Sequence, residues 1–453
     1  MNEFRKQPDS KAAERYRDMT ETPVPRLIIR LSIPTIISML VTAIYNAADT
    51  FFVGRISTEA TAAVGLAFSA MAVIQALGFF CGQGSGNYLS RMLGAGKQEE
   101  AEKMAATGLA LSMILGSLVA AGAILNIRQL SAFLGATGTT VDETVNYLRI
   151  IVLGAPFMMG QFVINNQLRY QGSAMYAMVG LLCGAILNIF LDPLLIFVFR
   201  MGVAGAALAT ISGQMISFFV LLAGSMHGVN IHLNIRNVRL NGHFIVQIIN
   251  GGIPALFRQG LAAVATVLLN RAAGVYGHAA IAGMSVTTRV TMFVSSALIG
   301  FGQGYQPVCS FNYGAEKKER VREGYFFCVR YGTIFLTVMA VFCFIFSPQI
   351  IAFFRNDPEV IAVGKVALRW QAAALPLLAC IVITNMMLQS IGKGVKASIT
   401  ASARSGIFFI PLILILPRVF GLLGVEMTQA VADILSVSVS IPLAAMELRK
   451  MKA

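Results

Sequence analysis

The sequence predicts an all-α integral membrane protein with twelve transmembrane helices, in two six-helix bundles related by a pseudo-twofold axis along the membrane normal. Three observations predict this fold: a very apolar composition, a series of long apolar runs, and an internal repeat. Of the 453 residues, 56% are hydrophobic and 12% are charged, whereas an average soluble domain has roughly 25% charged residues. This composition excludes a soluble enzyme.

Twelve apolar runs are long enough to cross a bilayer, which takes about 20 helical residues. Continuous apolar runs indicate helices, because the strands of a membrane barrel alternate apolar and polar residues. We expect the twelve helices near residues 27–53, 62–88, 105–126, 147–168, 176–199, 204–225, 244–274, 280–307, 325–347, 368–390, 400–420 and 424–445.

The basic residues predict an orientation. Lysine and arginine in the connections that share a side with the N-terminus outnumber those on the other side by more than two to one. Because connections rich in these residues stay in the cytoplasm, we expect a multi-pass protein of the plasma (inner) membrane with both termini cytoplasmic. The polar start of the chain lacks the short apolar core and cleavage site of a signal peptide, so the first span is expected to stay in the mature protein.

The internal repeat appears when the sequence is compared with itself. Gly82-Gln83-Gly84 recurs as Gly302-Gln303-Gly304, and at the same shift Gly94 recurs as Gly314 in the loop that follows. We name the shift that takes Gly82 to Gly302 the repeat shift. One ungapped shift over several helices predicts two repeats of six spans in the same orientation. The repeat shift also relates the pairs Pro34 and Pro254, Gly54 and Gly274, Pro156 and Pro376, Asn165 and Asn385, Leu168 and Leu388, and Gly172 and Gly392.

The repeat divides the chain into five parts. We expect a cytoplasmic N-terminal tail at 1–26, an N-lobe of helices 1–6 at 27–226, a cytoplasmic inter-lobe loop at 227–243, a C-lobe of helices 7–12 at 244–446 and a cytoplasmic C-terminal tail at 447–453. Transporters built from such repeats bind substrate between the two bundles and rock one bundle against the other. This step is an analogy of fold alone, so a functional interpretation needs particular residues.

Several kinds of site are not expected. The six cysteines lie in or beside apolar runs without a CxxC pair, and the four histidines lie in polar connections without the spacing of a metal site. The net charge of +14 belongs to the connections, and no basic, aromatic-rich soluble face accompanies it. We therefore expect no metal, no cofactor and no nucleic-acid partner. The expected partners are small molecules and membrane lipid, and the chain is expected to be a monomer.

Ionisable residues inside the apolar runs are the functional candidates, because a charge at bilayer depth costs roughly 2.5–3.5 kcal/mol or more. Two arginines in the second half can either pair with Asp433 of the last span or line a cavity between the bundles. The candidates are Asp49, Asp192, Arg258, Arg289 and Asp433.

Asp49 and Asp192 are expected at matching depths, roughly 9 and 12 Å from the outer ends of their spans. Asn188 shares a helix face with Asp192 through its i,i+4 spacing, and Thr210 is expected at a similar depth. Two carboxylates with amide and hydroxyl oxygens at one level are typical of a proton or sodium site. The alternative is that each aspartate only bonds a neighbouring helix. Pro34 predicts a kink in the first span.

Three segments carry a family resemblance: Tyr45–Gly54 (YNAADTFFVG), the loop Gly94–Lys97, and Asn188–Pro193 followed by Gly202–Gly205. In order and spacing they resemble the multidrug and toxic compound extrusion (MATE) family, in its bacterial multidrug-efflux branch, over essentially the whole chain. The resemblance implies that Pro34 is the bend of the first helix. It also implies a cation-binding network of Tyr45, Asp49, Tyr147, Asn165, Asn188, Asp192 and Thr210.

Tyr147 and Asn165 lie eighteen residues apart, or roughly 27 Å along a straight helix. Both can serve one site only if the fourth span bends, and Pro156 is the expected place for the bend.

The resemblance implies a cation-coupled antiporter that exports amphipathic cationic compounds, antibiotics among them, by alternating access. Some sodium-coupled members place acidic residues in the C-terminal half; here the seventh and tenth spans have none, which favours protons over sodium. One alternative is a lipid-linked saccharide flippase of a related two-bundle fold, which would need several basic residues in its cavity. Another is an intramembrane aspartyl protease, whose Gly-x-Gly-Asp motifs are absent.

Overall fold

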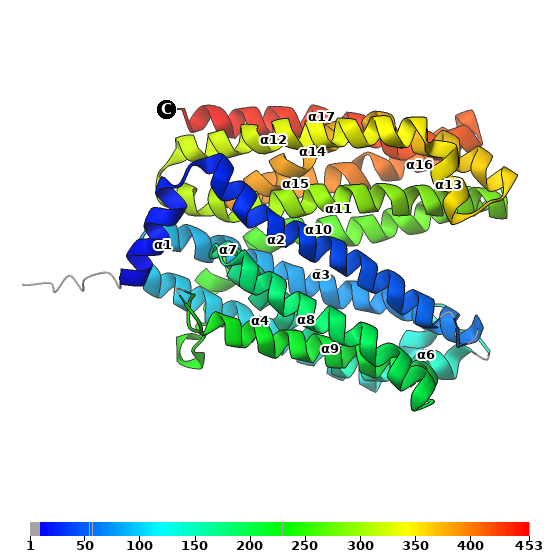
Figure 1. Ribbon diagram of the computed structural model, residues 1–453, viewed down its shortest axis with the longest axis horizontal. Coiled ribbons are helices and arrows are strands. Elements are labelled where there is room, and N and C mark those ends of the chain that lie inside the picture. Colours follow the sequence, from blue (N-terminus) through cyan, green and yellow to red (C-terminus); the bar gives the residue numbers. More distant parts are fainter. Residues whose placement is uncertain (1–9, 54, 57, 139, 229, 453) are drawn as a thin grey trace, which may run out of the picture.

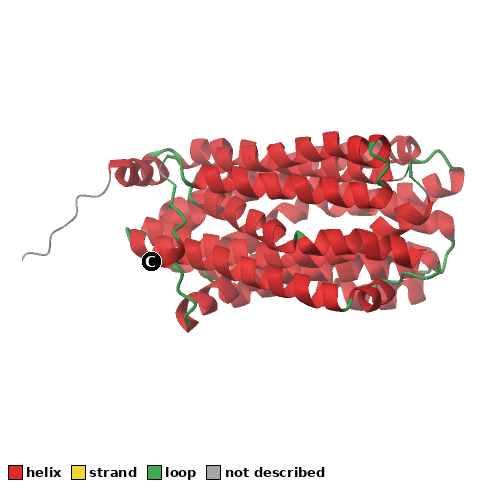
Figure 2. Cartoon of the chain, turned by 90° about the horizontal axis from the view of Figure 1, so that it is seen from below, coloured by secondary structure: helices red, strands yellow, loops and turns green. Residues whose placement is uncertain are grey.

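The computed structural model describes residues 10–53, 55–56, 58–138, 140–228 and 230–452, without the side chains at 10–12, 46–51, 58–59 and 62. Within these ranges the regular elements are all helical and no strand occurs (Figure 2). The long helices run side by side along the long axis of the molecule (Figure 1). In this part of the chain, eleven helices can each cross a membrane, and one bent pair makes a twelfth span. The prediction of twelve transmembrane helices is confirmed.

The first half contains a short helix on the polar N-terminal segment, which the sequence analysis did not predict, and the helices of six spans. The elements are α1 (Ser10–Glu21), α2 (Val24–Val53), α3 (Thr58–Gly94), α4 (Gln98–Leu125), α5 (Ile127–Phe133), α6 (Thr140–Leu153), α7 (Ala155–Tyr170), α8 (Ala174–Pro193), the π-helix η1 (Leu194–Val198) and α9 (Gly202–Ser225).

The second half follows a connection that holds one 3₁₀ turn, η2 (Ile235–Asn237). Its eleventh span is made of α15, the π-helix η3 and α16 in succession. The elements are α10 (Gly242–Gly274), α11 (His278–Gly314), α12 (Lys318–Ile345), α13 (Ser347–Phe354), α14 (Pro358–Ser390), α15 (Gly394–Ser402), η3 (Ala403–Ile407), α16 (Phe409–Phe420) and α17 (Leu422–Lys450).

The fourth span is bent by 49° between α6 and α7. The break falls at Gly154, and Pro156 occupies the first turn of α7, where its missing N–H costs no helical hydrogen bond. A Cβ on Gly154 would lie 2.8 Å from the side chain of Ile211. The counterpart of Gly154 is Ala374, and there the span continues as the single helix α14. The bend expected at Pro156 is therefore present two residues earlier and needs the glycine as well.

The internal repeat is visible in matching hydrogen bonds. Asn165 Nδ2 donates to the carbonyl of Ala177 at 2.9 Å, and its repeat counterpart Asn385 donates from Nδ2 to the carbonyl of Ala397 at 2.7 Å. The loops match as well, because Gly172 and its counterpart Gly392 both have a positive φ, of 86° and 79°. The two halves thus fold alike at positions that the sequence repeat pairs.

One loop position breaks this match and predicts a stabilising substitution. Gly96 has φ 74°, whereas its counterpart Glu316 adopts φ 61° with a side chain attached. Because a left-handed conformation strains residues that carry a Cβ, Glu316→Gly should stabilise the protein by about 0.5–1 kcal/mol after the entropy cost of glycine. Thermal unfolding in detergent should show a higher melting temperature. Ala315→Gly, at φ −79°, is the control and should lower it.

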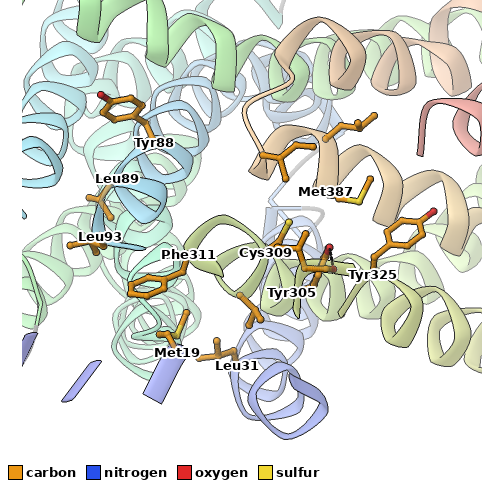
Figure 3. Close-up of a cluster of buried hydrophobic side chains, with 14 of the residues drawn as sticks. Met19, Leu31, Tyr88, Leu89, Leu93, Tyr305, Cys309, Phe311, Tyr325 and Met387 are labelled. Carbon is orange, nitrogen blue, oxygen red and sulfur yellow. Dashed lines mark hydrogen bonds between the residues drawn. The ribbon is translucent and has the colours of Figure 1, made fainter. Parts of the chain in front are cut away.

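The two ends of the molecule pack differently. We name the end that carries α1 and the C-terminus the termini end, and the other, with α6 and α13, the far end (Figure 1). At the termini end one buried apolar cluster joins both halves; in Figure 3, Phe311 of α11 lies with Leu93 of α3 and Met19 of α1. The other clusters among the described residues each belong to one half. The halves are therefore sealed together at the termini end and packed separately at the far end.

Glycines allow this seal. A Cβ on Gly94 would lie 2.0 Å from the carbonyl oxygen of Phe311, and a Cβ on Gly314 would lie 2.0 Å from the carbonyl oxygen of Arg91. The two contacts are related by the repeat shift, so α3 and α11 meet reciprocally about the pseudo-twofold axis. Backbone approach this close is possible only without side chains.

Helix α1 lies across the sealed end and contacts both halves. Arg15 Nη2 donates to Gln98 Oε1 of the first half at 3.2 Å, and Asn312 Nδ2 of the second half donates to the carbonyl of Met19 at 3.1 Å. Burial lowers the pKa of Arg15 to about 10, so this side chain is still charged at neutral pH. The segment expected as a simple tail therefore ties the two halves together.

Candidate functional site

Three of the predicted site residues meet between α8 and α9. Asn188 and Asp192, one turn apart on α8, are 1% and 0% exposed, and Thr210 of α9 is 1% exposed. With the Asn188 amide turned so that its nitrogen faces the carboxylate, Nδ2 donates to Asp192 Oδ2 at 3.1 Å and Oδ1 accepts from the backbone N–H of Thr210 at 3.2 Å. The amide thus fixes the carboxylate of one helix against the backbone of the next, at a depth where a charged group is costly.

Two more oxygens are buried on α9. Within the described part of the chain, Thr210 Oγ1 and Gln214 Oε1 have no hydrogen-bond partner, and their i,i+4 spacing places them on one face. Buried polar atoms normally have a partner, so these two are available to a water or a cation. The sequence analysis missed Gln214, although its spacing from Thr210 could have indicated it.

The backbone beside Asp192 is irregular. Pro193, the last residue of α8, has no N–H to donate, and the chain continues as the π-helix η1. Single π-turns inside α-helices are frequent at functional sites. The span ends at Val198, and Arg200 just beyond it has φ 56°.

Helix α2 supplies the remaining candidates of this region. It packs against α8 and contains Tyr45, which is half-buried, and Asp49, whose side chain lies outside the described residues. Pro34 is buried and α2 continues through it as one helix. Thr35 Oγ1 beside it donates to the carbonyl of Gly300 in the second half at 2.7 Å, so the proline lies where the halves meet.

Tyr147 and Asn165 occupy different places despite the bend. Tyr147 is fully buried, and its hydroxyl lies 3.9 Å from the sulfur of Met71. Asn165 bonds the carbonyl of Ala177, which lies fifteen residues before Asp192, or roughly 22 Å along α8. The structure therefore brings Asn188, Asp192 and Thr210 together and places Asn165 near the termini end.

The polar network has no equivalent in the second half. Each residue predicted for the site, Asn165 excepted, has an apolar counterpart at the repeat shift. Several counterparts belong to or pack on a buried apolar cluster. For Tyr45, Asp49, Tyr147, Asn188, Asp192 and Thr210 the counterparts are Ala265, Leu269, Ala367, Phe408, Leu412 and Ala430. The fold is doubled, but this polar site occurs once.

The second half has a polar group of its own. Asp433 on α17 accepts from Arg404 Nε of η3 at 2.8 Å and from Gln429 Nε2 at 2.9 Å. The counterparts of Arg404 and Asp433 are Gly184 and Gly213, which are in backbone contact. An ion pair thus fills the position where two glycines touch in the first half.

Arg258 and Arg289, the other predicted charges, do not pair with Asp433. Arg258 Nη1 donates to Asn385 Oδ1 at 3.1 Å, and Arg258 Nη2 donates to Gln83 Oε1 of the first half at 3.4 Å. Arg289 is exposed on α11. Pairing with Asp433 is therefore ruled out for both arginines, because Asp433 pairs with Arg404. Arg258 instead links the two halves through Gln83.

This ion pair gives a stability prediction. Replacing Arg404 by Met should destabilise the protein by about 2–3 kcal/mol, somewhat less than for a fully buried pair because the Arg404 side chain is 32% exposed. The double variant Arg404→Met with Asp433→Leu removes both charges and should recover most of the loss. Melting temperatures of the two variants and the parent measure the effect; equal melting temperatures of the single variant and the parent would contradict it.

Two similar six-span halves, sealed together at one end, with a buried carboxylate network in one half, are the architecture of a membrane transporter. The chain belongs to the MatE family, the multidrug and toxic compound extrusion transporters, whose family model matches residues 34–194 and 254–415. It is therefore a transporter and not an enzyme.

Known proteins agree with this assignment. The multidrug export protein MepA of Staphylococcus aureus (strain NCTC 8325 / PS 47) is 29% identical over 415 residues, which cover 91% of this chain and 92% of MepA. A multidrug resistance MATE family transporter in an outward-facing conformation has a TM-score of 0.91 at 27% identity, covering 98% of this chain and 100% of that chain. A transporter of the MOP superfamily from Pyrococcus furiosus, described as having a binding pocket of reverse polarity, has a TM-score of 0.90 at 27% identity, covering 99% and 100%.

Proposed function

We propose that the chain is a monomeric, cation-coupled multidrug antiporter of the plasma (inner) membrane, which exports amphipathic cationic compounds by alternating access. Protons are favoured over sodium as the coupling ion, and the exchange confers antibiotic resistance. The two moving parts are the N-lobe, 27–226, and the C-lobe, 244–446, with both termini cytoplasmic. The multidrug export named for MepA supports the substrate class, and the basic residues of the connections support the orientation.

The observation that carries the coupling mechanism is the buried Asn188–Asp192–Thr210 network. A carboxylate without water is destabilised in its charged form, so it binds a proton or a cation more readily than an exposed one. Asn188 holds Asp192 Oδ2, and Thr210 and Gln214 provide buried oxygens without a partner on the neighbouring helix α9. Neutralisation of Asp192 and Asp49 from outside would favour the state with low drug affinity, and release of the cation inward would restore the other state.

The conformation fits one step of this cycle. With the termini in the cytoplasm, the seal between the halves lies on the cytoplasmic side, and the separately packed far end faces outward. The solved MATE transporter described as outward-facing supports the same interpretation. Arg258 would hold the sealed state through Gln83 and would be released when the cytoplasmic side opens.

The membrane potential limits the stoichiometry. Moving one charge against it costs about 2.3 kcal/mol per 100 mV. Exchange of one monovalent drug cation for one proton moves no net charge, so it would be driven by the pH gradient alone. The preference for protons over sodium rests on the second half of the chain, whose seventh and tenth spans contain no acidic residue.

Purified protein in liposomes tests the proposal. Efflux of ethidium should follow an imposed pH gradient and should be absent under a sodium gradient of equal size, and Asp49→Asn should lose it. Efflux under the sodium gradient alone would replace the proton by sodium and keep the antiporter. Absence of ethidium transport under both gradients, together with transport of a lipid-linked saccharide, would instead establish the flippase alternative.

A further inference from the structure

A groove between α12 and α17 at the termini end lies apart from the candidate cation site. It has a volume of about 290 Å³. Figure 1 shows both helices on one flank of the molecule, and each packs against α14. Tyr325 and Phe326 of α12 and Ile441 and Leu448 of α17 form its apolar lining. Phe326 and Ile441 are 51% and 52% exposed, so the groove opens toward the lipid that surrounds the transmembrane helices.

The lining also has three basic side chains, Arg322, Arg449 and Lys452, and no carboxylate. Two carboxylates adjoin the lining residues in sequence, and both interact with other basic residues. Glu447 pairs with Lys396 of α15 and with Lys450, and Glu323 interacts with Arg320. The groove therefore offers three positive charges that no lining residue neutralises.

Charge and apolar surface are ordered along both helices. On α17 the apolar lining runs from Ile441 to Leu448, roughly 10 Å, and the basic residues follow at positions 449 and 452, toward the end of the molecule. On α12 the order is the same in space, because Phe326 lies one turn deeper than Arg322, whose guanidinium lies 5.6 Å from the Phe326 ring centroid. This is the polarity of a phospholipid, with its head group at the surface and its acyl chain inward.

We propose that this groove binds an anionic phospholipid. Its phosphate would contact Arg322, Arg449 and Lys452, and an acyl chain would lie against Phe326 and Ile441. Basic pockets between transmembrane helices bind anionic head groups in this way. A free anion would contact only the basic rim and would leave the apolar lining exposed. The inference depends neither on the coupling ion nor on the transported compounds.

Native mass spectrometry of the delipidated full-length protein, titrated with phosphatidylglycerol or with phosphatidylcholine, tests the proposal. The parent should bind phosphatidylglycerol more tightly than phosphatidylcholine. The triple variant Arg322→Gln, Arg449→Gln, Lys452→Gln should bind it at least about tenfold more weakly, because a basic residue near an anionic lipid surface typically accounts for about fivefold. The control is Arg17→Gln, Arg236→Gln, Lys393→Gln, which removes three exposed charges from the same end and should change the affinity little.

A second variant tests the apolar part without changing charge. Ala445 lines the groove, and Ala445→Phe should displace the acyl chain and also weaken phosphatidylglycerol binding. Melting temperatures in phosphatidylcholine would establish that each variant is folded. Equal losses in the test and control triples would overturn the proposal, since general surface charge would then account for the binding. Unchanged binding in the test triple and in Ala445→Phe would overturn it as well. A second cavity lies at the far end between α10 and α16 and is lined by Arg271 and Arg418. Loss of phosphatidylglycerol binding in the double variant Arg271→Gln, Arg418→Gln, but not in the test triple, would also overturn the proposal.

Discussion

Asp192→Asn should abolish gradient-driven efflux, reducing it to the rate of protein-free liposomes, while the protein stays folded. The side chain is fully buried and its Oδ2 accepts from Asn188. An amide of the same shape can keep most of the packing, but it cannot bind and release a proton or balance the charge of a sodium ion. The coupling step should therefore be lost without loss of the fold. Ethidium efflux under a pH gradient, with the melting temperature of the same preparation, measures both.

Asp142→Asn is the matched control for this experiment. Asp142 lies in the first turn of α6, in the same half of the chain, and is exposed. The same chemical change there should leave efflux close to that of the parent. Efflux retained by Asp192→Asn at the parent's rate would show that this carboxylate does not couple transport, and the network would then be a structural contact between α8 and α9.

Gly314→Ala should shift the protein away from the sealed conformation by roughly 5- to 150-fold. The added Cβ would lie 2.0 Å from the carbonyl oxygen of Arg91, so α3 and α11 must separate at the termini end. Overpacking of this kind typically costs about 1–3 kcal/mol. Because the contact joins the two halves, the cost falls on the sealed state and not on states in which the halves separate there. Gly94→Ala meets Phe311 in the same way and should act alike.

Spin-label distances measure this shift. Labels at Phe133→Cys of α5 and Phe353→Cys of α13, which are 88% and 86% exposed, report on the far end of each half in a background without the native cysteines. Gly314→Ala should populate shorter distances than the parent, together with loss of efflux. Gly122→Ala and Gly260→Ala, which meet no atom within 4 Å, should match the parent. A parental distance distribution in Gly314→Ala would show that the halves do not separate at this contact.

The doubled architecture could be predicted from the sequence because its signals are local or periodic. Apolar runs longer than a bilayer is thick determine the spans, and one constant shift, the one that takes Gly82 to Gly302, determines the two halves. The pair Asn188 and Asp192 could be predicted for the same reason, since an i,i+4 spacing on one helix fixes their common face.

Contacts between distant segments could not be predicted. Asn165 looked suitable for the cation site, but its amide holds α7 to α8 near the termini end. Arg258 and Asp433 were candidates for one pair, and each has another partner. The short helix α1 has no apolar run that would indicate it, and its place depends on Gln98 and Asn312 from opposite halves.

The sequence by itself therefore determined that the chain crosses a membrane, in twelve spans and two related halves, and that a buried acid, Asp192, lies in its first half. These properties follow from the cost of placing polar groups in lipid, which acts on each segment separately. Only the tertiary structure decided which carboxylate has an ordered network, which charges cancel and which end is sealed. Those features depend on how the helices pack against one another. A glycine at a contact lets two backbones come closer together than any residue with a side chain would allow.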